Sequence, residues 1–107
     1  MSYKRQTIRL VIERDGEFRR HGRTVACTVV DLSEAGVRVR TGSSVIVGEE
    51  LQLTCHLAKN RLLECTVEVT HATASSFGAR ITDISSEHLT QLKRFIDDLI
   101  AMNFPTA

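Results

Sequence analysis

The sequence has no tryptophan, one tyrosine and four phenylalanines, so aromatic residues make up only 5% of its 107 residues. Proteins that bind single-stranded nucleic acid usually stack the bases on aromatic side chains over a basic face. The formal net charge of +1 also gives no general attraction to a polyanion or to a membrane surface. The composition therefore argues against a polymeric nucleic acid as the partner.

Long apolar runs are absent as well, and no stretch approaches the roughly 18 apolar residues of a membrane-spanning helix. The first ten residues, MSYKRQTIRL, lack the apolar core of a secretory signal. The three cysteines form an odd set without a C-x-x-C pair, which fits a reducing cytoplasm. We expect one cytoplasmic domain, residues 1–107, with no membrane contact.

Apolar and polar residues alternate along most of the chain, which is the pattern of half-buried β-strands. The alternating runs are 7–14, 23–30, 37–41, 51–57, 62–71 and 77–81. Asp15-Gly16 is a hairpin signal that predicts a turn after the first run. Short strands without crossover helices predict a mainly β fold, a six-stranded antiparallel sheet closed into a barrel over residues 11–82.

The period changes near the C-terminus, in SSEHLTQLKRFIDDLIAMNF. The apolar residues there recur at helical spacing, namely Leu89, Leu92, Ile96, Leu99, Met102 and Phe104. Ser85 or Ser86 can cap the start, and Pro105 follows the end. We expect an α-helix over residues 85–103 that covers one opening or one flank of the barrel.

Cys27, Cys55 and Cys65 share the parity of the apolar residues in their strands, which predicts that they pack in the core. No spacing of cysteine and histidine matches a zinc site. An enzyme would need a nucleophile–base pair or paired acids in a pocket, and the scattered histidines offer none. We therefore expect neither a metal site nor catalysis.

The stretch DLSEAG, residues 31–36, separates two of the alternating runs. The Asp31 carboxylate can accept two parallel N–H bonds, and the Ser33 hydroxyl lies two residues further on. Gly36 permits a positive φ and lets a flat ligand approach without a Cβ in the way. An ordinary Asx or Ser turn needs the same residue types, so the stretch alone decides nothing.

Arginines precede this stretch in KRQTIR, where Arg5 and Arg9 are separated by three residues. Arg9 has the parity opposite to that of its apolar neighbours, which places it outside the barrel. Arginine forks bind phosphate, read the O6 and N7 edge of guanine and stack on bases. The alternative is a solvated edge strand with surface arginines. Arg19 and Arg23 have the same spacing but lie too close to Asp31 for a hairpin between them.

Arg5-Gln-Thr-Ile-Arg9 followed by Asp31-Leu-Ser33-Glu-Ala-Gly36 resembles the R-x-x-x-R and D-x-S-x-x-G motifs of the PilZ domain family. The strand pattern and the closing helix extend the resemblance over nearly the whole chain. It implies a receptor for cyclic di-GMP, a bacterial second messenger. Arg5 and Arg9 would hold phosphates and guanine edges. Asp31 would accept from guanine N–H groups, Ser33 would add a hydrogen bond, and Gly36 would keep the surface open.

The resemblance further implies that residues 1–10 form a flexible arm that leads into the first strand and folds over the ligand. Lys4 stands where the family's paired-ligand mode is associated with an arginine, so we expect a pair of ligands, bound without that planar stacking. Family members also stack a base on a side chain from a later strand. His71 is the nearest candidate by position, and an ordinary strand-end histidine is the alternative.

The sequence shows no fused effector domain, so we expect a stand-alone receptor that changes conformation on binding and signals through an unidentified protein effector. A ligand-free PilZ-like adaptor, which binds only proteins, is the alternative. The sequence also leaves open whether the helix packs on its own barrel or on a second chain, as in a homodimer.

Overall fold

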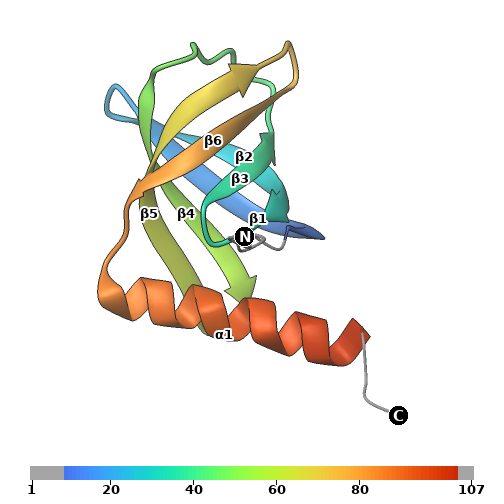
Figure 1. Ribbon diagram of the computed structural model, residues 1–107. Helices are drawn as coiled ribbons and strands as arrows, with labels where there is room; N and C mark the ends of the chain where they lie inside the picture. Colours follow the sequence, from blue (N-terminus) through green and yellow to red (C-terminus); the bar gives the residue numbers. More distant parts are fainter. Residues whose placement is uncertain (1–8, 104–107) are drawn as a thin grey trace, which may run out of the picture.

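The computed structural model describes residues 9–103. Its elements are β1 (Leu10–Arg20), β2 (Arg23–Leu32), β3 (Gly36–Arg40), β4 (Glu50–Ala58), β5 (Arg61–Ala72), β6 (Ser76–Asp83) and α1 (Ser86–Asn103). The strands pair antiparallel in the order β1-β2-β3-β6-β5-β4 and close into a barrel, and α1 lies across one end (Figure 1). This confirms the predicted six-stranded antiparallel barrel with a C-terminal helix.

The barrel is filled by the inward rows that the alternation predicts, including Val37 and Val39 of β3 and the apolar row of β4. Phe18 and Phe77, each 1% exposed, meet edge to face with ring centroids 5.5 Å apart. The attraction between the edge of one ring and the face of the other stabilises such a pair beyond the gain from burying both rings. An aromatic contact between β1 and β6 is therefore part of the core.

The three cysteines belong to this core, as the parity predicts: Cys55 and Cys65 are buried and Cys27 is half-buried. Burial disfavours the charged thiolate and raises the pKa of Cys55 and Cys65 to about 12. Burial, and then the nearby Glu17 carboxylate, raises the pKa of the Cys27 thiol to about 11. None of the three thiols is poised for nucleophilic chemistry near neutral pH.

We expect the native protein to resist alkylation by iodoacetamide at pH 8, because a thiol with a pKa near 11 is only about one part in a thousand ionised there. Intact-mass spectrometry would measure this. Protein unfolded in urea at the same pH is the control and should take up reagent at all three cysteines. Rapid native modification of Cys55 or Cys65 would contradict the placement of these residues in the core.

The first hairpin differs from the sequence prediction, because β1 runs through Asp15 and Gly16 without turning. The chain reverses at His21 and Gly22, whose φ values of 50° and 78° fit a two-residue type I′ turn. Gly16 is buried instead, and a Cβ there would lie 2.7 Å from the carbonyl oxygen of Thr54 in β4. The prediction of a turn at Asp15-Gly16 was wrong: this glycine allows β4 to pass close to β1.

The start of α1 agrees with the prediction, since Ser85 is its N-cap. The Ser85 Oγ accepts a hydrogen bond from the His88 N–H at 3.1 Å, and the Ser85 carbonyl accepts one from the Leu89 N–H at 2.9 Å. The first bond satisfies an N–H group that a helix start leaves unpaired, and the second is the first regular backbone bond of the helix. No helix in the described part of the chain is both long and apolar enough to span a bilayer.

The buried face of α1 agrees with the prediction only in part. Leu92 and Ile96 are buried as expected, whereas Met102 is 74% exposed, because the helix projects beyond the barrel (Figure 1). Phe95, which the sequence analysis missed, is 4% exposed and lies under the guanidinium of Arg14, at 5.5 Å from the ring centroid. The helix therefore packs on its own barrel through its middle turns.

Candidate functional site

Asp31 lies near the end of β2 with its carboxylate between two guanidinium groups. Its Oδ1 is 3.1 Å from Arg9 Nη1, and its Oδ2 is 3.7 Å from Arg38 Nε. The Asp31 side chain is only 11% exposed, while those of Arg9 and Arg38 are 55% and 58% exposed. The carboxylate is thus fixed in place, and both arginines present their remaining N–H donors to solvent.

The β2–β3 turn is built around Ser33, which is 2% exposed. Its Oγ accepts hydrogen bonds from the N–H groups of Ala35 and Gly36, at 3.2 Å and 3.1 Å, and its own N–H donates to the Gly36 carbonyl at 2.9 Å. This is the serine turn that the sequence left open as an alternative. The hydroxyl holds the turn that follows Asp31, so a direct contact of Ser33 with a ligand stays a prediction.

The backbone of Gly36 does not have the positive φ that the sequence analysis allowed for. A glycine is needed at this position for another reason. A Cβ on Gly36 would lie 2.6 Å from the carbonyl oxygen of Ala79 in β6. Gly36 pairs with Arg80 in the β3–β6 ladder, so any side chain would push the two strands apart. The expectation of a left-handed residue was wrong, and the need for glycine comes from close backbone packing.

A hollow of about 370 Å³ lies over β3, β5 and β6, next to the two ion-pair partners of Asp31. Arg9 and Arg38 line it together with polar side chains of β5 and of the β5–β6 turn, among them Thr70, His71 and Thr73. Its size is within the range of small-molecule sites, and its rim offers guanidinium donors, hydroxyls and an imidazole. The hollow can therefore receive an anionic, hydrogen-bonding ligand.

We call Asp31, its two ion-pair partners Arg9 and Arg38, and the turn residues Ser33 and Gly36 the Asp31 cluster. Arg38 is the member of this cluster that the sequence analysis did not single out. Two observations in the sequence could have found it: it alternates with the inward Val37 and Val39, and it follows closely on the D-x-S-x-x-G stretch. In the structure it is the cross-strand partner of Asp31. That pairing across β2 and β3 brings its Nε to the carboxylate.

His71 is exposed at the end of β5, so the inward row of that strand stops at Val69. The β5–β6 register shifts between these two residues, and such a bulge turns the following side chain to the other face. His71 therefore lines the hollow together with Arg9 and Arg38, and its stacking on a base stays a prediction.

The other predicted residues, Lys4 and Arg5, lie outside the described residues, as does almost all of the expected arm, 1–10. The structure brings together Arg9, Asp31, Ser33 and Gly36 at one end of β1–β3.

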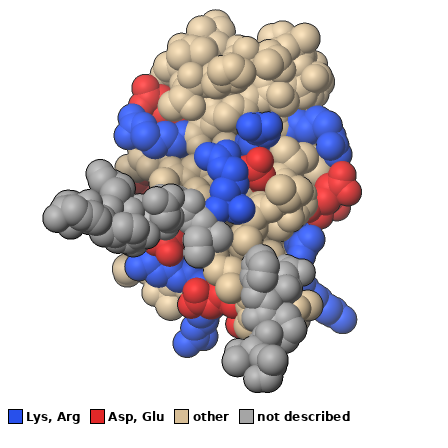
Figure 2. Space-filling view, turned by 45° about the vertical axis from the view of Figure 1, so that its right-hand side comes forward, with Lys and Arg blue, Asp and Glu red and all other residues tan. Residues whose placement is uncertain are grey.

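On the face drawn in Figure 2, basic side chains form a band with acidic ones among them, and the upper end carries no charge.

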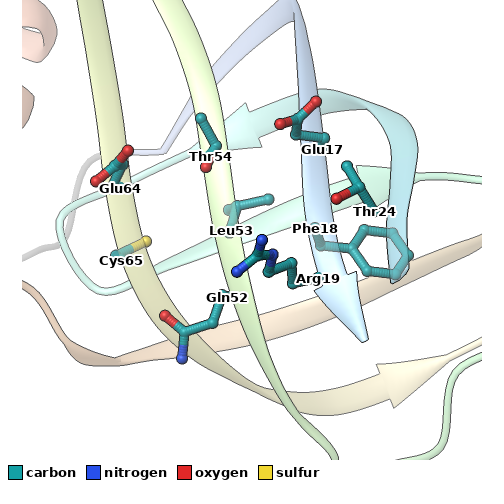
Figure 3. Close-up of a pocket in the computed structure, with 9 residues that line it drawn as sticks. All are labelled: Glu17, Phe18, Arg19, Thr24, Gln52, Leu53, Thr54, Glu64 and Cys65. Atoms are coloured by element: carbon teal, nitrogen blue, oxygen red, sulfur yellow. The ribbon is translucent and has the colours of Figure 1, made fainter. Parts of the chain in front are cut away.

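A second hollow, of about 310 Å³, lies on the opposite wall, where β1 pairs with β4 over Gly16–Arg19 only (Figure 3). Its polar lining combines the carboxylates of Glu17 and Glu64 with a single guanidinium, that of Arg19. None of the predicted site residues lines it. Two carboxylates make it a poor site for a phosphate, so the Asp31 cluster remains the candidate site.

The family model described as PilZ domain matches residues 3–98 of this sequence. The chain is a member of the PilZ domain family. Among curated proteins, none matches it. The match includes both motifs, so the described part of the Asp31 cluster lies within the PilZ domain.

Solved structures show the same fold. The PilZ domain of YcgR from Escherichia coli, determined with c-di-GMP, has a TM-score of 0.76 at 13% identity over 94% of this chain and 95% of that one. MotI/DgrA, the inhibitor of motility from Bacillus subtilis, gives 0.74 at 18% identity over 92% and 52%. The MrkH–c-di-GMP complex from K. pneumonia gives 0.75 at 14% over 95% and 55%. The chain thus spans about half the length of the last two proteins.

Proposed function

We propose that this PilZ domain is a non-enzymatic, cytoplasmic receptor for cyclic di-GMP. The observation that carries the proposal is the Asp31 carboxylate held between Arg9 and Arg38, the two arginines that line an open hollow. A fixed carboxylate can accept the N–H groups of a guanine, and guanidinium groups can bind its O6 and N7 or the phosphates. The YcgR and MrkH structures, which have this fold, were determined with that nucleotide.

The Arg9–Asp31 ion pair bears on how the ligand would bind. Arg9 Nη1 lies 3.1 Å from one carboxylate oxygen of Asp31. A guanine that takes this carboxylate would displace Arg9, which is then free to bind phosphate or the guanine edge. Lys4 and Arg5 would add cations from the arm, and the ligand would bind as a pair. Ser33 and Gly36 would keep the Asp31 turn in shape.

The output of such a receptor would pass through another protein, because ligand binding changes the arm and the surface around the hollow. A ligand-free adaptor is the second candidate, and one observation favours it: the Arg9–Asp31 ion pair engages groups that a nucleotide would need. The two candidates differ in whether the hollow binds nucleotide at all, which calorimetry can decide.

We expect calorimetric titration of cyclic di-GMP to show binding that weakens roughly tenfold to a hundredfold in Arg9→Ala and in Asp31→Ala, since each loses a charged hydrogen bond of about 1.5–3 kcal/mol. A stoichiometry of two nucleotides per chain would support the paired mode. Arg61→Ala is the matched control, because Arg61 forms a similar exposed ion pair with Asp98 at 3.4 Å, away from the hollow. Absence of heat, or equal loss in the control, would refute the receptor.

A further inference from the structure

The end of the barrel opposite α1 carries two uncharged segments. Residues 42–48 lie in the link from β3 to β4, in which Glu49 is the one charged residue, and residues 73–76 cover the turn from β5 to β6 and the first residue of β6, while 25% of the whole chain is charged. The loops lie side by side, since the Thr41 N–H donates to the Ser75 carbonyl at 2.9 Å. Figure 2 shows this end as an uncharged surface above the band of basic side chains. We call residues 42–48 and 73–76 the uncharged cap.

The uncharged cap exposes two adjacent branched apolar side chains, Ile46 at 68% and Val47 at 59%. Among the described residues, the other large apolar side chains with such exposure are Val11 and Met102, which are far apart in the sequence. Single exposed apolar residues are common on protein surfaces, whereas grouped ones mark contact sites. The pair on the cap is therefore the stronger candidate for a binding surface.

Hydrogen bonds hold both loops of the cap in place. The Glu49 N–H donates to the Ile46 carbonyl at 2.9 Å, and the Ile46 N–H donates to the Glu49 carboxylate at 3.0 Å. Val45 is buried and anchors the same loop in the core. In the second loop the Thr73 N–H donates to the Ser76 carbonyl at 2.8 Å. Because the loops are ordered in advance, a partner would lose little conformational freedom of the cap on binding.

Positive charge borders the cap on the side of the β1–β2 hairpin. The Arg20 guanidinium lies 2.6 Å from the Glu49 carboxylate, so this acid is already paired. His21 and Arg23 are exposed, and they share a hollow of about 320 Å³ with Ser43 of the cap. An apolar centre with a polar border, in which arginine is favoured, is the usual composition of a protein–protein interface.

This composition favours a protein over a lipid surface. Membrane-surface sites place tryptophan or other large aromatic and apolar side chains beside several lysines. The cap contains no aromatic residue and no lysine, and its apolar part consists of two short branched side chains. An apolar part of only two side chains suits a transient contact with a short peptide segment.

We propose that the uncharged cap is a docking surface for another protein, whose contacting segment carries apolar side chains in its centre and a carboxylate at its edge. Thr73 and Ser76 of the cap also line the hollow beside Arg9 and Arg38, so the docking surface adjoins the candidate nucleotide site. The inference extends the adaptor part of the proposed function. Its test uses no nucleotide, so its failure would leave the calorimetric result untouched.

The test is selection from a random peptide library on the wild-type protein, after depletion on the Ile46→Ser/Val47→Ser variant. We expect a consensus of apolar residues flanked by Asp or Glu. A synthetic consensus peptide should bind the wild type at least about tenfold more tightly than the depleted variant. Arg23→Glu should weaken binding as well. The matched control is Val11→Ser/Met102→Ser, which removes the other exposed apolar side chains and should bind like the wild type.

Three results would overturn the docking surface. The first is a selection without any consensus, or a peptide that binds the cap variant and the wild type equally. The second is co-sedimentation with phosphatidylglycerol vesicles that the cap variant loses, because the cap would then bind lipid. The third is a wild-type dimer in analytical ultracentrifugation that dissociates in the cap variant, because the cap would then bind a second copy of the chain.

Discussion

Gly36→Ala is expected to destabilise the barrel by about 1–3 kcal/mol, the usual cost of forcing an extra carbon into a packed site. The new Cβ would lie 2.6 Å from the Ala79 carbonyl oxygen, which belongs to the backbone and cannot rotate away as a side chain would. β3 must then shift from β6, and the turn at Ser33 shifts with it. Urea denaturation followed by circular dichroism would measure the loss.

Gly42→Ala is the matched control for this substitution. No atom lies within 4 Å of a Cβ built on Gly42, and its φ is not in the left-handed region. The alanine there should leave stability unchanged or raise it by about 0.4–1 kcal/mol, because it restricts the unfolded chain. Equal destabilisation by the two substitutions would show that contact with Ala79 is not the reason for glycine at position 36.

Phe18→Ala is expected to cost more, about 3–5 kcal/mol of the free energy of unfolding, as truncation of a buried aromatic ring usually does. Phe18 is 1% exposed and contacts Phe77 of β6 edge to face in the core. Since small domains are stable by only about 5–15 kcal/mol, the variant should be close to unfolding at 37 °C. Thermal and urea unfolding would give the value.

A double-mutant cycle with Phe77→Ala isolates the contact between the rings. The coupling between the two substitutions should be about 0.5–1.5 kcal/mol. Phe18→Leu, which keeps most of the buried volume, is the control and should lose less than Phe18→Ala. Additive effects of the two alanine substitutions would contradict a direct ring–ring contribution.

The parts of the fold that follow a local rule could be predicted from the sequence. Alternation of apolar residues placed Val37, Val39 and the rows of β4 and β5 correctly, because neighbouring side chains of a strand point to opposite faces. The turn at Asp15-Gly16 failed for the opposite reason. A glycine needed for the approach of a distant strand looks the same in the sequence as a glycine needed for a turn.

In the candidate site, too, the residues that follow a local sequence pattern could be predicted, and the contacts that depend on distant strands could not. The D-x-S-x-x-G pattern identified Asp31, Ser33 and Gly36, yet the reason for Gly36 depends on Ala79, far along the chain. Arg38 was missed because its pairing with Asp31 depends on the β2–β3 register, which includes a bulge between Val29 and Asp31. Lys4 and Arg5 stay predictions that nucleotide binding can test.

The two long-range seams of the barrel imply an order of folding. Strands β1-β2-β3 and strands β4-β5-β6 are each linked by short turns and can pair early. The β1–β4 seam pairs Gly16 with Cys55, and the β3–β6 seam pairs Gly36 with Arg80, so both join segments far apart in the chain. Bringing such distant segments together costs chain entropy before any contact compensates for it. The two three-stranded units should therefore form first, and the cylinder should close last and open first at these two seams.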